Sequence, residues 1–537
     1  MSTPYPNLAN RAGGGHPSVL STRAHERLRL CLMVVVPLIL ALAISVAMPE
    51  PTVKSVLEVV GIALGAVGVL ALIASTRYTV SLTLLALYLG LLDGPVKLEV
   101  ADKLASGFRD VLIFAIALGM LLRMTRRGEQ LKLPPLGAWV VAFVAVVAIQ
   151  ALNPETSGFL KVVGGYRQQL EFVPLFFFGY LIIRSKTRFR QLFLVFGVIA
   201  LANGLVAAYQ SRLAPDALAS WGPGYSLEVS GSGLGRTFVA GGVSHPRPPA
   251  LGSDSGFGGG VGVLALPGLL ALLTTARLRR RWPVVLCALG AVLGIATAAS
   301  RTSIIIAVVT LASFVALSLI ARIRFGRALA GLLIVFALAG GVAWALIAAE
   351  GSSVFHRQES LVAKLEGSAP VNAEGVETGG DSKEKHLSEI PRDLTHAPFG
   401  LGLGVSGSAG GFGGHEKVTI EDEKVSGGSA YNLLAVELGA PGLLLWVGLT
   451  LSVLILGLRG MRRIADTELR MYMVAILASY IGFTVQGLAG VTLAVTPAGA
   501  YVWFVPGVIA YWFAGPGRSA MRGIASATTP RASGALA

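Results

Sequence analysis

One residue of this sequence that is well suited to chemistry is an arginine between two apolar runs. Arg301 stands in "AASRTSIIIAVV", where Ser300, Thr302 and Ser303 surround it with hydroxyl groups. An arginine near the centre of a membrane costs roughly 2.5 to 3.5 kcal/mol on insertion scales, so it usually faces protein, water or a partner. A helix that begins here would add free backbone amides and a positive dipole end, which bind anions. The pattern predicts a phosphate-binding site, or else an interfacial anchor that reaches lipid headgroups.

Three further arginines could join Arg301 on the same side of a membrane. Arg167 lies in "GGYRQQLEF", and Arg236 and Arg247 lie in a glycine-rich connection. An arginine suits a diphosphate because its planar guanidinium donates two parallel, charge-assisted hydrogen bonds. An ion pair within one helix is an equal alternative for Arg167, since Glu171 follows it by one helical turn. We predict that these four arginines bind diphosphate.

Two residues are candidates for proton transfer. Glu437 lies inside the apolar stretch "YNLLAVELGAPGLLLW", and His396 opens "HAPFGLGLGVSG". A carboxylate in such a helix is either a structural hydrogen-bond partner or a functional acid or base. A loop histidine is usually only solvated, but it can also serve as a base. We predict Glu437 and His396 as catalytic candidates, and we expect no metal or other cofactor because no metal-ligand spacing is evident.

The elements that must position these residues are membrane-spanning helices. The chain has 537 residues, 54% of them hydrophobic and 14% charged, and a mean hydropathy of +0.70, which lies outside the range of soluble domains. A helix needs about 20 apolar residues to cross a bilayer. We predict an all-α polytopic membrane protein with about fourteen transmembrane helices, near 30–48, 56–75, 78–93, 109–123, 135–152, 171–184, 190–209, 257–276, 282–299, 303–321, 328–348, 432–457, 471–489 and 498–514.

The orientation follows from the basic residues, because cytoplasmic loops keep an excess of Lys and Arg. With the N-terminus inside, tight basic clusters fall on one side, at 123–127, 184–190, 277–281, 322–327 and 459–463. Topology thus explains the net charge of +15 without nucleic acid. The predicted order is a cytoplasmic tail (1–29), helices 1–7 (30–209), an outer loop (210–256), helices 8–11 (257–348), a large outer loop (349–431), helices 12–14 (432–514) and a cytoplasmic tail (515–537).

Three stretches, taken in order, resemble a known family. "LGIATAASRTSIIIAVVTLASF" resembles the signature of the O-antigen ligase and O-antigen polymerase superfamily, in which a small-residue helix ends in Ser-Arg and another apolar helix follows. "APFGLGLG" and "YNLLAVELGAPGLLLW" resemble the two motifs that come next. The similarity covers roughly residues 160 to 460.

The resemblance implies a metal-independent glycosyltransferase at the outer face of a bacterial inner membrane. Such enzymes move a saccharide from polyprenyl diphosphate to an acceptor hydroxyl on a glycan or lipid, either as polymerases or as ligases. Outer arginines would hold the diphosphate, and this role falls on Arg301 and on Arg167. The family often has His-Asn before the Glu and Gly positions, where this chain has Gly428 and Ser429.

Two other classes of function remain open at this point. A transporter or flippase of lipid-linked saccharide also fits many spans, and movement of cargo without a new glycosidic bond would identify it. A scaffold that binds other envelope polysaccharide assembly proteins would instead tolerate loss of every outer arginine. The absence of an internal repeat and the large outer loops favour the glycosyltransferase.

Overall fold

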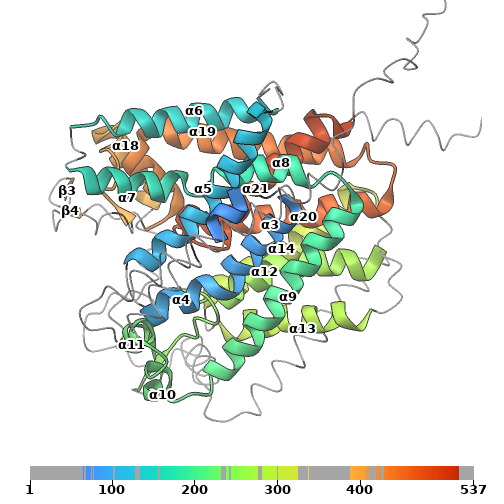
Figure 1. The fold of residues 1–537 in the computed structure, drawn as a ribbon, viewed down its shortest axis with the longest axis horizontal. Helices are drawn as coiled ribbons and strands as arrows, with labels where there is room; N and C mark the ends of the chain where they lie inside the picture. The colour runs from blue at the N-terminus through green and yellow to red at the C-terminus, as the bar shows by residue number, and fades with distance from the viewer. Residues whose placement is uncertain are drawn as a thin grey trace, which may run out of the picture. The chain divides into compact units, whose positions relative to one another are not determined.

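The structure is a computed structural model of a predominantly helical chain (Figure 1). It describes residues 68–73, 78–100, 103–126, 133–154, 158–230, 237–240, 243–275, 281–298, 300–323, 387–407, 419–420, 423–424 and 428–518, with a few single positions between them. The chain divides into two compact units, residues 1–78 with 114–129 and residues 79–113 with 130–537. The contacts discussed below belong to the second unit, while residues 114–126 of the helix α5 (Lys103–Arg126) belong to the first.

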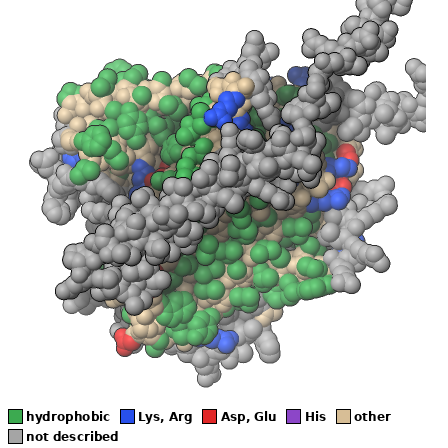
Figure 2. Space-filling model, in the orientation of Figure 1, with side chains coloured by type: hydrophobic (Ala, Val, Ile, Leu, Met, Phe, Trp, Pro, Cys, Tyr) green, Lys and Arg blue, Asp and Glu red, His purple; other side chains and the backbone are tan. Residues whose placement is uncertain are grey.

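Six described helices are long and apolar enough to cross a membrane, and they cover Tyr78–Glu99, Lys186–Gln210, Phe257–Thr274, Thr302–Ile320, Ala430–Met461 and Thr467–Ala489. Shorter apolar helices cover Gly137–Gln150, Trp282–Thr297 and Ala498–Ala514. Figure 2 shows a broad hydrophobic surface over the described helices. These features confirm a helical protein suited to a membrane, while the total of fourteen spans stays a prediction.

The predicted spans that fall on described residues coincide with helices. These are α3 (Tyr78–Leu87) with the π-helix η1 (Tyr88–Leu92) and α4 (Asp93–Val100), α5 (Lys103–Arg126), α6 (Gly137–Gln150), α8 (Pro174–Ile182), α9 (Lys186–Gln210), α12 (Phe257–Thr275), α13 (Trp282–Thr297), α14 (Arg301–Ile320), α19 (Ala430–Met461), α20 (Thr467–Ala489) and α21 (Ala498–Ile509) with the π-helix η4 (Ala510–Ala514). The predicted span 30–48, and most of the spans 56–75 and 328–348, lie outside the described residues.

The connections contain elements that the hydropathy pattern did not predict. The helix α7 (Phe159–Leu170) precedes α8. Between α9 and α12 lie α10 (Pro215–Ala219), α11 (Pro223–Ser230) and an antiparallel hairpin of β1 (Thr237–Ala240) and β2 (Val243–Pro246), in which Thr237 faces Pro246. Before α19 come α18 (Ile390–His396) and a hairpin of β3 (Thr419–Ile420) and β4 (Glu423–Lys424). The two hairpins are the described exceptions to an all-α fold.

The helices α9, α12 and α13 pack closely together, because glycines lie where their backbones meet (Figure 1). A Cβ atom added at Gly204 of α9 would lie 2.1 Å from the Gly290 carbonyl oxygen of α13. One added at Gly262 of α12 would lie 2.4 Å from the Ala291 carbonyl oxygen. Small residues let helix backbones approach in this way inside membranes. The packing of α14 on α20, of α19 on α6 and of α21 on α8 completes the bundle.

One end of α9 is joined to the start of α20 by ion pairs. Lys186 Nζ lies 2.6 Å from Asp466 Oδ2, and Arg190 Nε lies 2.7 Å from Glu468 Oε1. Asp466 also caps α20 by accepting the backbone N–H of Leu469 at 3.0 Å. Burial by itself would raise the pKa of Asp466, but the hydrogen bonds from Lys186 and from Leu469 lower it below its ordinary value.

The helix α19 is broken at Gly439, where φ is 65° and ψ is −162°. The backbone groups freed by the break bond the glycine-rich loop that precedes the helix: Leu401 N donates to Val436 O at 2.8 Å, and Ala440 N donates to Pro398 O at 2.9 Å. In a membrane every such group needs a partner inside the protein. The second and third motifs of the sequence are therefore one packed unit.

We expect Gly439→Ala to destabilise the protein by about 1–3 kcal/mol, because a left-handed φ is strained for alanine and the new Cβ would lie 2.4 Å from Gly400 N. The thermal unfolding temperature of the purified protein in detergent measures the effect. Gly107→Ala is the matched control, because a Cβ there has nothing within 4 Å. Equal unfolding temperatures for both variants would contradict the packing described here.

We expect Asp466→Asn to lower stability at neutral pH by less than about 1 kcal/mol, since the ion pair is partly exposed and asparagine keeps the cap. The folded pKa of Asp466 is depressed, so its contribution is complete above the unfolded pKa and is lost as the pH falls through the folded pKa. The difference in unfolding temperature between variant and wild type should therefore vanish in acid. A difference that grows in acid would contradict this assignment.

Candidate functional site

The last turn of α7 positions the candidate site. Its sequence Arg167-Gln168-Gln169-Leu170 continues into Glu171, which ends the helix. Gln168, Gln169 and Glu171 are buried, with relative exposures of 4%, 3% and 3%. Residues four apart lie on the same face of a helix, so Arg167 and Glu171 point toward one set of neighbours and the two glutamines toward another.

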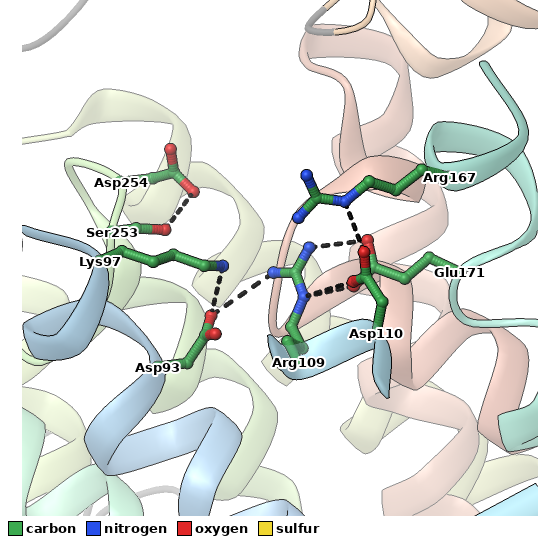
Figure 3. A network of polar contacts seen from close by, with 8 residues as sticks. All are labelled: Asp93, Lys97, Arg109, Asp110, Arg167, Glu171, Ser253 and Asp254. Atoms are coloured by element: carbon green, nitrogen blue, oxygen red, sulfur yellow. Dashed lines mark hydrogen bonds and ion pairs between the residues drawn. The ribbon is translucent and has the colours of Figure 1, made fainter. Parts of the chain in front are cut away.

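Arg109 of α5 is the centre of a buried ion network (Figure 3). Its Nη2 donates to Glu171 Oε2 at 2.7 Å, and its Nε forms an ion-pair contact with Glu171 Oε1. On its other side Nη1 lies 3.5 Å from Asp93 Oδ2 of α4, which also contacts Lys97 Nζ at 2.7 Å. The guanidinium lies 5.2 Å from the centre of the Phe172 ring as well. Arg109 is therefore held on several sides and is 6% exposed.

Arg167 occupies the more exposed margin of the same network. Its Nε lies 2.7 Å from Asp110 Oδ2, and the Arg167 side chain is 25% exposed. Figure 3 shows the terminal nitrogens of Arg167 directed away from Asp110. The α4–α5–α7 ion network, made of Asp93, Lys97, Arg109, Asp110, Arg167 and Glu171, thus balances three cations with three carboxylates.

Glu437 of α19 accepts four hydrogen bonds from amides of the chain. Gln169 Nε2 donates to Oε2 at 2.7 Å, and Gln168 Nε2 donates to Oε1 at 3.3 Å. The backbone N–H groups of Gly404 and Ser406 donate to Oε1 at 3.1 and 3.4 Å. Glu437 is fully buried. This arrangement fits the structural alternative of the sequence prediction, in which the carboxylate is a hydrogen-bond partner.

The glycine-rich loop 397–407 is fixed from the α6 side as well. Gln150 Nε2 donates to Phe399 O, Asn153 Nδ2 donates to Gly400 O at 3.1 Å, and Leu403 N donates to Thr156 Oγ1 at 2.9 Å. Gly400 has a φ of 88°. A Cβ there would lie 2.5 Å from the Glu437 carbonyl oxygen, which only glycine avoids.

The helix α18, which ends at His396, is bound to the start of α19. Asp393 of α18 is buried and accepts Asn432 Nδ2 at 2.9 Å, which ties the two helices together. The His396 ring is exposed, and its Nδ1 lies 2.9 Å from Arg392 O. A carbonyl oxygen only accepts, so Nδ1 carries the proton and Nε2 is the acceptor of the neutral ring.

Arg301 is the first residue of α14, as the sequence predicted. Ser300 caps the helix, and its hydroxyl accepts the Ser303 N–H at 3.4 Å. The start of α14 packs tightly on α12, since a Cβ at Gly259 would lie 2.7 Å from Ser303 Oγ. The side chain of Arg301 lies outside what the structure describes.

The other two predicted arginines fall in the connection between α9 and α12. Arg236 lies outside the described residues. Arg247 follows β2 and is partly buried. Three residues later, Ala250 is bound by Gln210 of α9, which donates to Ala250 O at 3.1 Å and accepts Ala250 N at 2.8 Å. The end of α9 therefore fixes the position of the chain just after Arg247.

The structure brings some of the predicted residues together. Arg167 and Glu437 are joined through α7, and His396 is joined to α19 through α18. The ion pair described for Arg167 is with Asp110, and the one described for Glu171 is with Arg109. Sequence reasoning missed Arg109 and the residues that bind it. The sequence feature that could have identified them is the presence of ionisable side chains at the ends of apolar spans.

Comparison with known proteins gives no assignment: no protein-family model matches the chain, and no curated protein matches it. Among the described residues, no group of three or more His, Cys, Asp or Glu side chains is arranged to hold a metal ion.

We expect Arg109→Met to destabilise the protein by about 3–5 kcal/mol, because Glu171 would stay buried without its cation. The double variant Arg109→Met with Glu171→Met should recover much of this loss, since a buried ion pair is replaced by apolar side chains of similar size. Arg167→Met is the matched control at the exposed margin and should cost about 1 kcal/mol or less. Thermal unfolding in detergent compares the three. An Arg109→Met protein as stable as Arg167→Met would contradict the central place of Arg109.

Proposed function

We propose that the protein is a membrane glycosyltransferase that moves a saccharide from polyprenyl diphosphate to an acceptor hydroxyl. The donor would be a lipid-linked oligosaccharide at the outer face of a bacterial inner membrane. The acceptor would be a glycan or a lipid, which corresponds to a polymerase or a ligase.

One observation supports this proposal above the others. The second and third sequence motifs pack backbone to backbone at Gly400 and Gly439, and Glu437 of the third motif binds amides of the second. The same carboxylate binds α7 next to Arg167. Motifs identified only by their order in the sequence therefore form one rigid support beside a partly exposed arginine.

The arginines would act on the leaving group. Breaking the bond between sugar and diphosphate gathers negative charge on the diphosphate, and prearranged cations stabilise that charge. Arg167 would contribute its terminal nitrogens, and Arg301 would contribute its charge at the start of α14, where backbone amides and the helix dipole act in the same direction. Arg109 would keep Arg167 and Glu171 in place without touching the substrate.

His396 is the better candidate for the base that removes the proton of the acceptor hydroxyl. Its ring is exposed, and the hydrogen bond of Nδ1 with Arg392 O leaves Nε2 as the acceptor. Glu437 has no exposed surface and accepts four hydrogen bonds. We therefore propose a positioning role for Glu437 and proton transfer for His396.

The test is saccharide transfer from polyprenyl diphosphate to a radiolabelled acceptor in reconstituted vesicles. We expect Arg167→Lys and Arg301→Lys to lower kcat by about 100-fold or more, because a point charge does not replace a bidentate guanidinium. His396→Ala should lower kcat by about 100-fold or more with unchanged thermal unfolding. Arg212→Ala, at an exposed arginine after α9, is the control and should keep wild-type turnover.

The outcomes separate the proposed function from its alternatives. Normal transfer by folded Arg167→Lys and Arg301→Lys proteins would overturn the arginine roles. Movement of the lipid-linked saccharide across the vesicle membrane with no new glycosidic bond would overturn the transferase in favour of a transporter. An unchanged cellular glycan profile in a strain carrying both substitutions would favour a scaffold.

A further inference from the structure

A hydrophobic groove lies between α3, α8, α9, α12 and α21. Hydrophobic side chains such as Leu82, Phe178, Val195 and Phe504 line it. Of the described residues that line the groove, Arg188 alone carries a charge. The apolar lining suits a hydrocarbon chain.

The groove has the length of one membrane leaflet. Its lining follows α3 and η1 from Thr79 to Gly90 and α9 from Arg188 to Ile199. The two segments meet at one end, where Gly90 packs against Ile199. Eleven steps of helix at 1.5 Å per residue give roughly 16 Å, which is about half of a bilayer hydrocarbon core of roughly 30 Å.

The end of the groove at Gly90 is closed by packed backbone. Asn203 of α9 donates to Gly90 O at 2.8 Å and accepts the N–H of Leu251 at 3.0 Å. One turn beyond Gly90, a Cβ added at Gly94 would lie 2.2 Å from the carbonyl carbon of Gly252. A headgroup therefore does not fit at this end, and the polar end of any ligand must lie at the other.

Arg188 stands at that other end, in the first turn of α9. Its Nη1 bonds the neutral Gln191 Oε1 at 3.0 Å. The neighbouring Arg190 is paired with Glu468, whereas no described carboxylate pairs with Arg188. The helix dipole adds positive potential at the start of α9. An anionic group bound here would gain a charge-assisted hydrogen bond.

We infer that this groove binds one phospholipid of the membrane leaflet next to the start of α9, with an acyl chain along α9 and the phosphate on Arg188. This site is separate from the proposed transfer site, because Asn203 and the packing at Gly94 close the groove on the side of Asp93. Phospholipid binding here does not depend on the proposed function. The lipid would fill the space between α3, α8 and α9 and stabilise their packing.

The test adds phosphatidylglycerol to the delipidated full-length protein and counts bound lipid by native mass spectrometry. We expect one tightly bound molecule in the wild type. Val195→Trp, which fills the groove, should weaken its binding by about tenfold or more, and so should Arg188→Gln, which removes a charge-assisted hydrogen bond. Val198→Trp is the matched control, because Val198 is exposed on the same helix and does not line the groove.

A second measurement keeps the inference testable if Val195→Trp fails to fold. Phosphatidylglycerol with a photoreactive group on its acyl chain should label the lining residues of the wild-type protein, and Arg188→Gln should reduce this labelling while Arg463→Gln leaves it unchanged. Labelling elsewhere, or equal binding by Arg188→Gln and wild type, would overturn the inference. Binding of undecaprenyl phosphate with no binding of phosphatidylglycerol would overturn it in favour of an isoprenoid site.

Discussion

One turn of helix, residues 167–171 at the end of α7, carries the contacts on which the proposed site depends. Its charged residues, Arg167 and Glu171, bind α5, while Gln168 and Gln169 bind Glu437 of α19. A rotation of this turn would break both sets of contacts together. Because Glu171 and both glutamines are buried, each broken contact would leave a polar group without water, which costs about 1–3 kcal/mol for a neutral group and more for a charge.

The burial of Glu437 explains why the neighbouring loop is rich in glycine. A carboxylate without water needs several donors, and Gly404 and Ser406 supply two of them from the backbone. The loop reaches this position only by passing next to the backbone of α19, where side chains at Gly400 or Gly439 would collide with it. The break at Gly439 then provides Val436 O and Ala440 N as partners for the loop. The glycine-rich loop and the helix break at Gly439 together supply the hydrogen-bond partners that the burial of Glu437 requires.

Hydropathy predicts the part of this fold that depends on local sequence. Spans such as 257–276 and 282–299 match α12 and α13 because crossing a bilayer requires only length and apolar character, and the helix expected to begin at Arg301 is α14. Hydropathy did not predict α7, because the polar face of this helix contacts protein. The partners of Arg109 could not be predicted from the sequence either, since 62 residues separate Arg109 from Glu171. Sequence spacing instead suggested the nearer pair of Arg167 with Glu171.

The magnitudes of the ion pairs decide which arginine of the network can serve a ligand. A diphosphate at Arg109 would have to displace Glu171, and an uncompensated buried charge costs about 3–5 kcal/mol. The pair of Arg167 with Asp110 lies at the margin, with side chains 25% and 19% exposed. Partly exposed pairs contribute about 0–1 kcal/mol, less than the roughly 1.5–3 kcal/mol of a charge-assisted hydrogen bond. Under the proposed function, exchange of Asp110 for a phosphate oxygen would therefore cost less at Arg167 than displacement of Glu171 would cost at Arg109, so in this proposal the buried arginine has a supporting role and the marginal one makes the contact with the ligand.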